Sequence, residues 1–313
     1  MINFRYHVVS LTAVFLALAI GLIVGTAALN GPVADSLNER VAMLSKSNDQ
    51  WREKVADLEK ELSLEEDFAV EAAQIMLPNT LTGRRILVLG LPSGRDYVEG
   101  VLEMLRLTGA TITGRVDILD KFVDPDNNDA LLELALRAAQ PTVPATGLPG
   151  NSDGAETSSA LLASGLLDSA PGAPAVTEPD RRALLNAYSN AGYLTVDGKV
   201  SGPAEAVVVV SGQAYVDKNA DKKDLSVVRM VAQFDKAASL VVAGSGSADG
   251  NIVATVRKQP NLAQSISTVD NSNTPQGQLT VALATVEQVA TKRVGHYGIG
   301  AGRASLLPPK STS

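Results

Sequence analysis

The stretch "RRILVLG", residues 84–90, decides the fold of the larger part of this sequence. Its two arginines are followed by four consecutive apolar residues and a glycine. An uninterrupted apolar run is typical of a parallel strand covered on both faces, whereas a strand with one face in water alternates. Pro78 and Gly83 precede the run and separate it from the helical pattern before it. The stretch therefore predicts a buried strand in an α/β domain.

The residues that follow repeat the same signal. An amphipathic helix is expected from Tyr97 to Leu107, Gly109 ends it, and "ATITGRVDIL" (110–119) reads as the next strand, which completes a β-α-β unit. Further strands are expected at "AEAVVVVSG" (204–212), "ASLVVAGS" (238–245), "SISTVD" (265–270) and "QLTVALA" (278–284), with helices at 179–191, 224–237 and 249–259. We expect an open, mostly parallel sheet with helices on both faces, Rossmann-like and not a β-barrel, over residues 79–307.

Two segments of this α/β domain lack the apolar density of a packed element. Residues from about 140 to 175 are rich in Pro, Gly, Ala and Ser, and we expect a flexible loop there. The tail 308–313 is expected to be disordered.

The amino-terminal end carries a 22-residue uncharged run from Val8 to Leu29. At about 1.5 Å per residue such a helix reaches about 33 Å, which is enough to cross a bilayer core of about 30 Å. Arg5 and His7 precede the run, so the positive-inside bias places the amino terminus in the cytoplasm and the bulk of the chain outside. The alternative is a cleavable signal peptide cut after Gly25-Thr26-Ala27, although the run is long for one. Residues 1–30 are thus expected to be a cytoplasmic tip and a transmembrane helix.

Small residues recur at every fourth position of this run, at Ala17, Gly21 and Gly25. A small-xxx-small face lets two helix backbones approach closely in lipid. The alternative is one lipid-facing helix with incidental glycines.

Residues 31–78 continue with apolar positions spaced alternately four and three, which is typical of a left-handed coiled coil. With Val41 at position a, Asn48 takes the next a position, where a polar residue fixes register and favours two parallel strands. Lys54 and Glu59 then fall at facing g and e positions. We therefore expect a parallel homodimer whose seam is formed by Leu37, Val41, Leu44, Asn48, Trp51, Val55, Leu58 and Leu62. The alternative is a single amphipathic helix that packs on its own domain.

Charge and composition exclude some classes of function. A net charge of −7 with no basic stripe argues against nucleic-acid binding. The chain has no cysteine, so disulfides and thiolate metal sites are excluded. No catalytic triad and no nucleophile elbow is visible, and we expect no enzymatic activity.

Two glycine-rich loops are candidates for ligand binding. In "GSGSADGN" (244–251), Gly244, Gly246 and Gly250 follow a strand, and Asp270 ends the next strand, where an acid could bind a ribose. The glycine spacing is one residue too long for a dinucleotide fingerprint, so a nucleotide or small-molecule sensor remains an alternative function. In "GHYGIGAGR" (295–303), His296 and Tyr297 lie among four glycines, as a ligand loop or as a tight turn.

Four features of the sequence together resemble one known family. The opening "RYHVVSLTAVFLALAIGLIVG" (5–25), the coil behind it, and the closing "ISTVD" (266–270) and "VGHYGIG" (294–300) are similar to the copper-transport protein B (MctB) family of mycolic-acid-bearing actinobacteria. The family is also called SteB where it is tied to cell separation. The resemblance implies a cell-envelope protein, described either as a copper-efflux or outer-membrane component or as a membrane partner of SteA that influences peptidoglycan hydrolysis.

Copper enters through this resemblance alone, and no resident cofactor is expected. Soft copper ligands are thiolate, thioether and imidazole. Beyond the expected membrane helix the chain offers one histidine, His296, and a few scattered methionines. The methionines are expected at seam or core positions: Met43, Met76, Met104 and Met230. We expect a non-enzymatic, membrane-anchored homodimer that binds an envelope protein, with copper transport as the alternative. The resemblance implies that this partner is a SteA-like protein or a peptidoglycan hydrolase.

Overall fold

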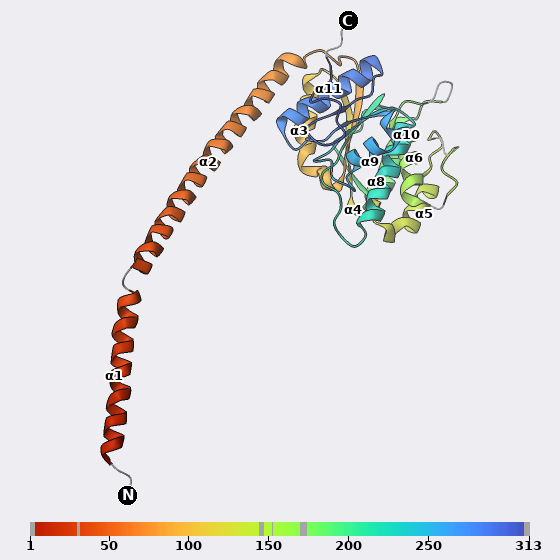
Figure 1. The fold of residues 1–313 in the computed structure, drawn as a ribbon. Helices are drawn as coiled ribbons and strands as arrows, with labels where there is room; N and C mark the ends of the chain where they lie inside the picture. Colours follow the sequence, from red (N-terminus) through yellow and green to blue (C-terminus); the bar gives the residue numbers. More distant parts are fainter. Residues whose placement is uncertain (1–3, 30–31, 144–146, 152, 170–173, 310–313) are drawn as a thin grey trace. The chain divides into compact units, whose positions relative to one another are not determined.

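A computed structural model describes residues 4–29, 32–143, 147–151, 153–169 and 174–309 of the chain (Figure 1). The described residues divide into two compact units, 1–65 and 66–313. The first contains helix α1 (Phe4–Leu29) and most of helix α2 (Pro32–Met76). The second, which we call the head, begins with the last turns of α2 and contains all the strands.

The head is an open α/β sheet with seven strands in the order β3-β2-β1-β4-β5-β6-β7. The pairs are parallel except β2 with β3, which is antiparallel. The mostly parallel sheet expected from the sequence is thereby confirmed. The strands are β1 (Arg85–Gly90), β2 (Thr111–Ile118), β3 (Leu194–Asp197), β4 (Ala206–Val210), β5 (Ser239–Ala243), β6 (Ile266–Val269) and β7 (His296–Tyr297).

Helices cover both faces of this sheet, as Figure 1 shows with α3 and α11 on one side and α5, α6, α8 and α9 on the other. The helices of the head are η1 (Pro92–Tyr97), α3 (Val98–Leu107), α4 (Asp120–Val123), η2 (Pro125–Asn127), α5 (Asn128–Ala138), α6 (Gly154–Leu166), α7 (Glu178–Asn190), α8 (Ala220–Asp235), α9 (Ile252–Lys258), α10 (Pro260–Ala263) and α11 (Pro275–Thr291).

Strand β1 explains why its sequence is uniformly apolar. Leu87 and Leu89 belong to one core cluster, whereas Ile86 and Val88 belong to the other, and all four are fully buried. Alternate side chains point to opposite faces, so a strand between two helical layers has no polar position.

The last turns of α2 belong to the core of the head. Ala69, Ala73 and Leu77 are spaced four residues apart and are buried, and Ala73 and Leu77 join the core cluster beneath α3 and α11. The spacing places them on one helix face. Ala69, which continues the apolar spacing of the expected seam, is therefore covered within the head.

Two expectations from the sequence differ from the structure. "QLTVALA" (278–284) is not a strand but the middle of helix α11, which begins after Thr274, whose side chain accepts a hydrogen bond from the Gly277 amide, with Pro275 in the first turn. A short apolar run does not distinguish a strand from a buried helix, and here the capping residues decide.

The second difference lies within the expected flexible loop, residues 140–175. Residues 154–166 form helix α6, which is almost wholly buried and packs between α5 and α8. The Asp153 side chain caps it by accepting from the Glu156 amide at 2.7 Å, and Tyr188 donates to Ser158 at 2.9 Å. Small Ala and Ser side chains permit this close packing although they supply little apolar signal. Residues 144–146, 152 and 170–173 of that segment, and 310–313 of the expected disordered tail, lie outside the described residues.

Candidate functional site

In a doubly wound sheet, ligands bind where the strand order reverses, which here is between the carboxyl ends of β1 and β4. The loops that follow these strands are pressed together. Gly212 donates its backbone N–H to Ser93 Oγ at 3.1 Å, and a Cβ on Gly212 would collide with the Ser93 carbonyl. A Cβ on Gly94 would collide with the backbone of Val210 and Ser211. The glycines thus let two backbones meet where other proteins of this architecture open a crevice.

The next strands along the sheet bring the candidate ligand residues together, although they are far apart in sequence. Gly244 donates its N–H to the Val269 carbonyl at 2.8 Å, and Gly246 donates to the Asp270 carbonyl at 2.6 Å. Ala301 in the 295–303 loop donates to Ser247 Oγ at 3.0 Å. Both loops therefore meet over the end of β6.

Other groups of the same chain already hydrogen-bond to both oxygens of the Asp270 carboxylate. Oδ2 accepts from Arg257 Nη1 at 2.7 Å, and Oδ1 accepts from the N–H groups of Ile299 and Gly300 at 2.7 and 3.0 Å. The Asp270 side chain is fully buried and that of Arg257 nearly so. This arrangement ties the 295–303 loop to β6, and it gives Asp270 a structural role where a ribose-binding acid was the candidate.

Arg257 is the residue that sequence reasoning missed. Its guanidinium also donates to Thr268 Oγ1 at 2.9 Å and to the carbonyls of Tyr297 and Ala301, each at 2.7 Å. The sequence signal that could have identified Arg257 is its position on α9, four residues after the buried Val253 and therefore on the same helix face.

His296 and Tyr297 form the short edge strand β7. His296 Nδ1 lies 2.9 Å from Thr268 Oγ1. Burial, together with the charge of Arg257, lowers the His296 pKa below its usual value, so the imidazole is neutral at pH 7. The Tyr297 hydroxyl hydrogen-bonds to the carboxylate of Glu287, and burial together with that bond raises the pKa of the hydroxyl. Both side chains hold β7 against its neighbours.

Gly250 begins the turn into α9 with a positive φ of 86°. The following residue, Asn251, accepts from the Val253 amide at 2.9 Å and donates to the Gly212 carbonyl at 2.8 Å. The loop 244–251 is thereby linked to the loop that follows β4.

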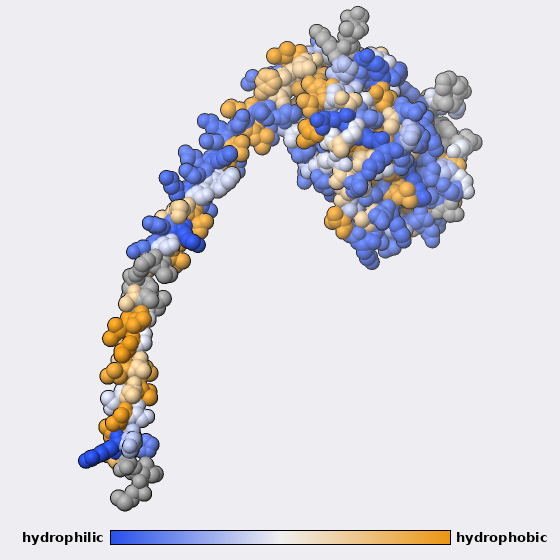
Figure 2. Space-filling view, in the orientation of Figure 1, coloured by the Kyte–Doolittle hydropathy of each residue, from blue (hydrophilic) through white to orange (hydrophobic). Residues whose placement is uncertain are grey.

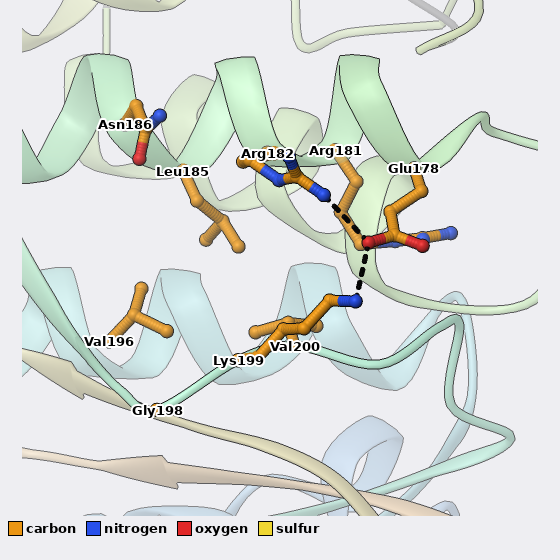
Figure 3. A pocket seen from close by; sticks show the side chains of 9 residues that line it. All are labelled: Glu178, Arg181, Arg182, Leu185, Asn186, Val196, Gly198, Lys199 and Val200. Carbon is orange, nitrogen blue, oxygen red and sulfur yellow. Dashed lines mark hydrogen bonds and ion pairs between the residues drawn. The ribbon is translucent and has the colours of Figure 1, made fainter.

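A cavity of about 250 Å³ lies between α7 and the segment after β3 (Figure 3). Glu178 accepts from Arg182 at 2.8 Å and from Lys199 at 2.9 Å, and these two cations lower the Glu178 pKa. Arg181 is buried, and its guanidinium donates to the carbonyls of Gly165 and Val176. The charges around the cavity thus join α7 to the adjoining segments.

The residues expected to mediate dimerisation lie on α1 and α2. Unlike the loops of the head, they form an exposed surface. Seven apolar side chains of the expected seam are 50–70% exposed, and Asn48 among them is exposed as well: Leu37, Val41, Leu44, Trp51, Val55, Leu58 and Leu62. On α1, Ala17, Gly21 and Gly25 are exposed, and a Cβ placed on either glycine meets nothing within 4 Å. Contacts among the described residues of the single chain therefore do not require either glycine.

The family model described as "Copper transport outer membrane protein, MctB" matches residues 1–308. The chain belongs to the MctB family. A relative named "Copper transporter MctB" from Mycobacterium tuberculosis (strain H37Rv) is 28% identical over 98% of this chain and 99% of its own length. One of the same name from Mycobacterium leprae is 27% identical over 99% of this chain and all of its own. The likeness runs from the amino-terminal helix through the head.

Membrane association follows from this family together with α1. One helix among the described residues, Phe4–Ala27, is long and apolar enough to span a membrane. The family description names the outer membrane.

The copper in the MctB name has few soft ligands to draw on in the described residues. Met104 and Met230 are buried in the two cores, and His296 is half-buried with one ring nitrogen engaged by Thr268. No group of three or more His, Cys, Asp or Glu side chains placed to hold a metal ion occurs among the residues that the structure describes.

Proposed function

We propose that this MctB-family protein is a non-enzymatic, membrane-anchored homodimer whose parallel coil carries paired heads, and that the heads bind an envelope protein. The observation that carries the proposal is the exposed apolar seam of α2. Seven large apolar side chains in water on one helix are unfavourable, because burying each Val or Leu gains about 1.5–3 kcal/mol. A second copy of the same helix supplies the matching surface.

Two further features support parallel pairing in particular. Asn48 stands among the apolar positions of the seam, where two facing amides satisfy each other only when the chains are in register. The small residues of α1, which begin at Ala17, form a face on which a second backbone can approach in lipid. A parallel pair brings both features onto the same two-fold axis.

The head supports protein binding more than turnover of a small molecule. At the edge where α/β proteins bind ligands, Asp270 is fully engaged by its own chain and the loops after β1 and β4 are in contact. The resemblance to the septation branch suggests a SteA-like protein or a peptidoglycan hydrolase as the partner. In this reading the membrane lies at the amino-terminal end, with the amino terminus cytoplasmic and the head outside.

A cysteine placed at Asn48 tests the pairing, because the chain has no native cysteine and the new thiol is unique. In a parallel coil the two Asn48→Cys side chains face each other across the seam and are expected to form a disulfide on mild oxidation in membranes. The measurement is the fraction of dimer on a non-reducing gel.

Lys46→Cys is the matched control, since position 46 lies on the outer face of the same helix turn. Pairing predicts a high yield of crosslinked dimer at 48 and little at 46. Equal yields at both positions indicate random collision and contradict the coil.

Copper transport is the second candidate function, and the family description favours it. Copper would then be cargo. Among the described residues, His296 is a weak candidate ligand, and a dimer would contain two such histidines.

A further inference from the structure

A groove in the head lies between the last turns of α2, helix α11 and the segment near residue 306. It encloses about 380 Å³, which is within the range of small-molecule sites. Its walls are almost wholly apolar and are formed chiefly by Phe68, Ala72, Met76, Leu279, Leu306 and Leu307. A second cavity of about 730 Å³ shares Met76 and Leu307 with it, so the apolar tract continues along α11.

Several of these side chains are exposed although they are large and apolar. Phe68 is 71% exposed and Leu306 is 61% exposed. Figure 2 shows apolar side chains gathered at the carboxyl-terminal end of α2. Contiguous apolar surface of this kind marks a site that binds something apolar.

One buried polar group lies in the wall of the groove. Asn271 is 7% exposed, and among the residues that the structure describes its Oδ1 has no hydrogen-bond partner and its Nδ2 reaches only Thr274 Oγ1, at 3.5 Å. Exchanging the amide oxygen and nitrogen leaves an amide atom without a partner as well. Buried amides normally have hydrogen-bond partners. A ligand in the groove can supply the partner that the Asn271 amide lacks, after a small rotation of the side chain.

The charge of the groove walls limits further which class of ligand can bind. The described residues that line the two cavities include no Lys, Arg or His, and the one ionisable group, Glu287, is already bonded to Tyr297 and Arg293. An anionic head group would find no cation here. The site therefore suits a hydrocarbon chain that ends in an uncharged hydrogen-bonding group.

We propose that this groove binds a neutral single-chain lipid, a long-chain alcohol or its close equivalent, with the hydroxyl at Asn271 and the chain along α2 and α11. The proposal does not depend on pairing through the coil.

The test uses the full chain in phosphatidylcholine nanodiscs and a long-chain alcohol that carries a mid-chain diazirine and a terminal alkyne. After irradiation, labelled peptides are mapped by mass spectrometry. We expect labelling near Phe68–Met76 and Leu306, competed by unlabelled alcohol and several-fold less by the corresponding fatty acid. Labelling of α1, which contacts the bilayer, is the internal standard.

Two variants locate the site. Leu306→Glu places a charge at the exposed rim of the groove and is expected to reduce head labelling roughly tenfold. Val216→Glu places the same charge at a still more exposed position outside the groove and is expected to leave head labelling unchanged. Asn271→Ala is expected to lower labelling by the alcohol several-fold relative to an alkane probe of equal length. A purely structural effect of the substitution would lower labelling by both probes to the same extent.

Three results would overturn the proposal. The first is labelling confined to α1, and the second is head labelling that unlabelled alcohol does not compete. The third is head labelling that disappears as the protein concentration rises, because a second copy would then be the occupant of the groove.

Discussion

At the scale of single residues, the buried pair Arg257–Asp270 is the centre of the carboxyl edge of the sheet. Removing one partner of a buried ion pair leaves the other charge without compensation, which costs about 3–5 kcal/mol. Asp270→Asn is therefore expected to lower the free energy of unfolding of the head by about that amount. Hydrogen exchange of the β5 and β6 amides measures it.

The control for this pair is the exposed ion pair between Lys258 and Asp249. Exposed pairs contribute about 0–1 kcal/mol, so Asp249→Asn is expected to change the same amides little. An equally small effect of Asp270→Asn would mean that the pair is not what holds the 295–303 loop.

His296 gives the head a dependence on pH. Its pKa is below the usual 6.5 in the folded state, so below pH 6.5 the unfolded chain binds the proton more readily and folding stability falls. The stability that the neutral imidazole contributes is present above pH 7 and is lost as the pH falls through 6.5 toward the folded-state pKa. His296→Gln is expected to flatten this part of the profile, measured by hydrogen exchange between pH 7.5 and 5.5. A steeper profile in the variant would contradict it.

Sequence reasoning found some of this site and not the rest. Asp270 and the loop 244–251 follow neighbouring strands, and the carboxyl ends of parallel strands meet, so their proximity follows from the pattern. The partner of Asp270 does not, because Arg257 comes from a helix whose rotation about its axis is set by packing. Without that partner, a structural acid and a ligand-binding acid look the same.

At the scale of elements, the strands were predicted well because double burial forces an apolar run. The errors fall where two explanations share one pattern. The apolar run at 278–284 fits a buried helix as well as a strand, and α6 is built from small residues that resemble a linker. Strands β3 and β7 were missed, since four and two residues at the two sheet edges carry little signal, and His296 and Tyr297 were expected in a loop or turn.

Helix α2 packs into the head at its carboxyl-terminal end and forms the seam of the proposed dimer before it, and point mutations can separate these two roles. Leu77, just after its last turn, is fully buried in the head, and Leu77→Ala is expected to cost about 2–5 kcal/mol of head stability. Leu58 is 54% exposed, and Leu58→Ala is expected to leave the head unchanged but to reduce crosslinking of Asn48→Cys. Hydrogen exchange and gel analysis in the Asn48→Cys background read the two effects separately. If Leu58→Ala destabilised the head, the division of roles would be wrong.

At the scale of the whole molecule, the MctB name and the ligand chemistry of this chain lead to opposite expectations about copper. Under the proposed scaffold role, Cu(I) titration of the full chain in nanodiscs is expected to show no tight stoichiometric binding, and His296→Ala is expected to change nothing. Tight binding that this variant abolishes would instead establish copper handling. Isothermal titration calorimetry under anaerobic conditions makes the measurement, with His7→Ala as the control for the other histidine.

The placement of Trp51 has a practical consequence. It is the sole tryptophan of the chain and belongs to the proposed seam, whereas the head contains none. Indole emission therefore reports on α2 alone and is expected to shift to the blue when the proposed pairing excludes water from that surface. A fluorimeter can thus follow assembly in intact membranes without any added dye.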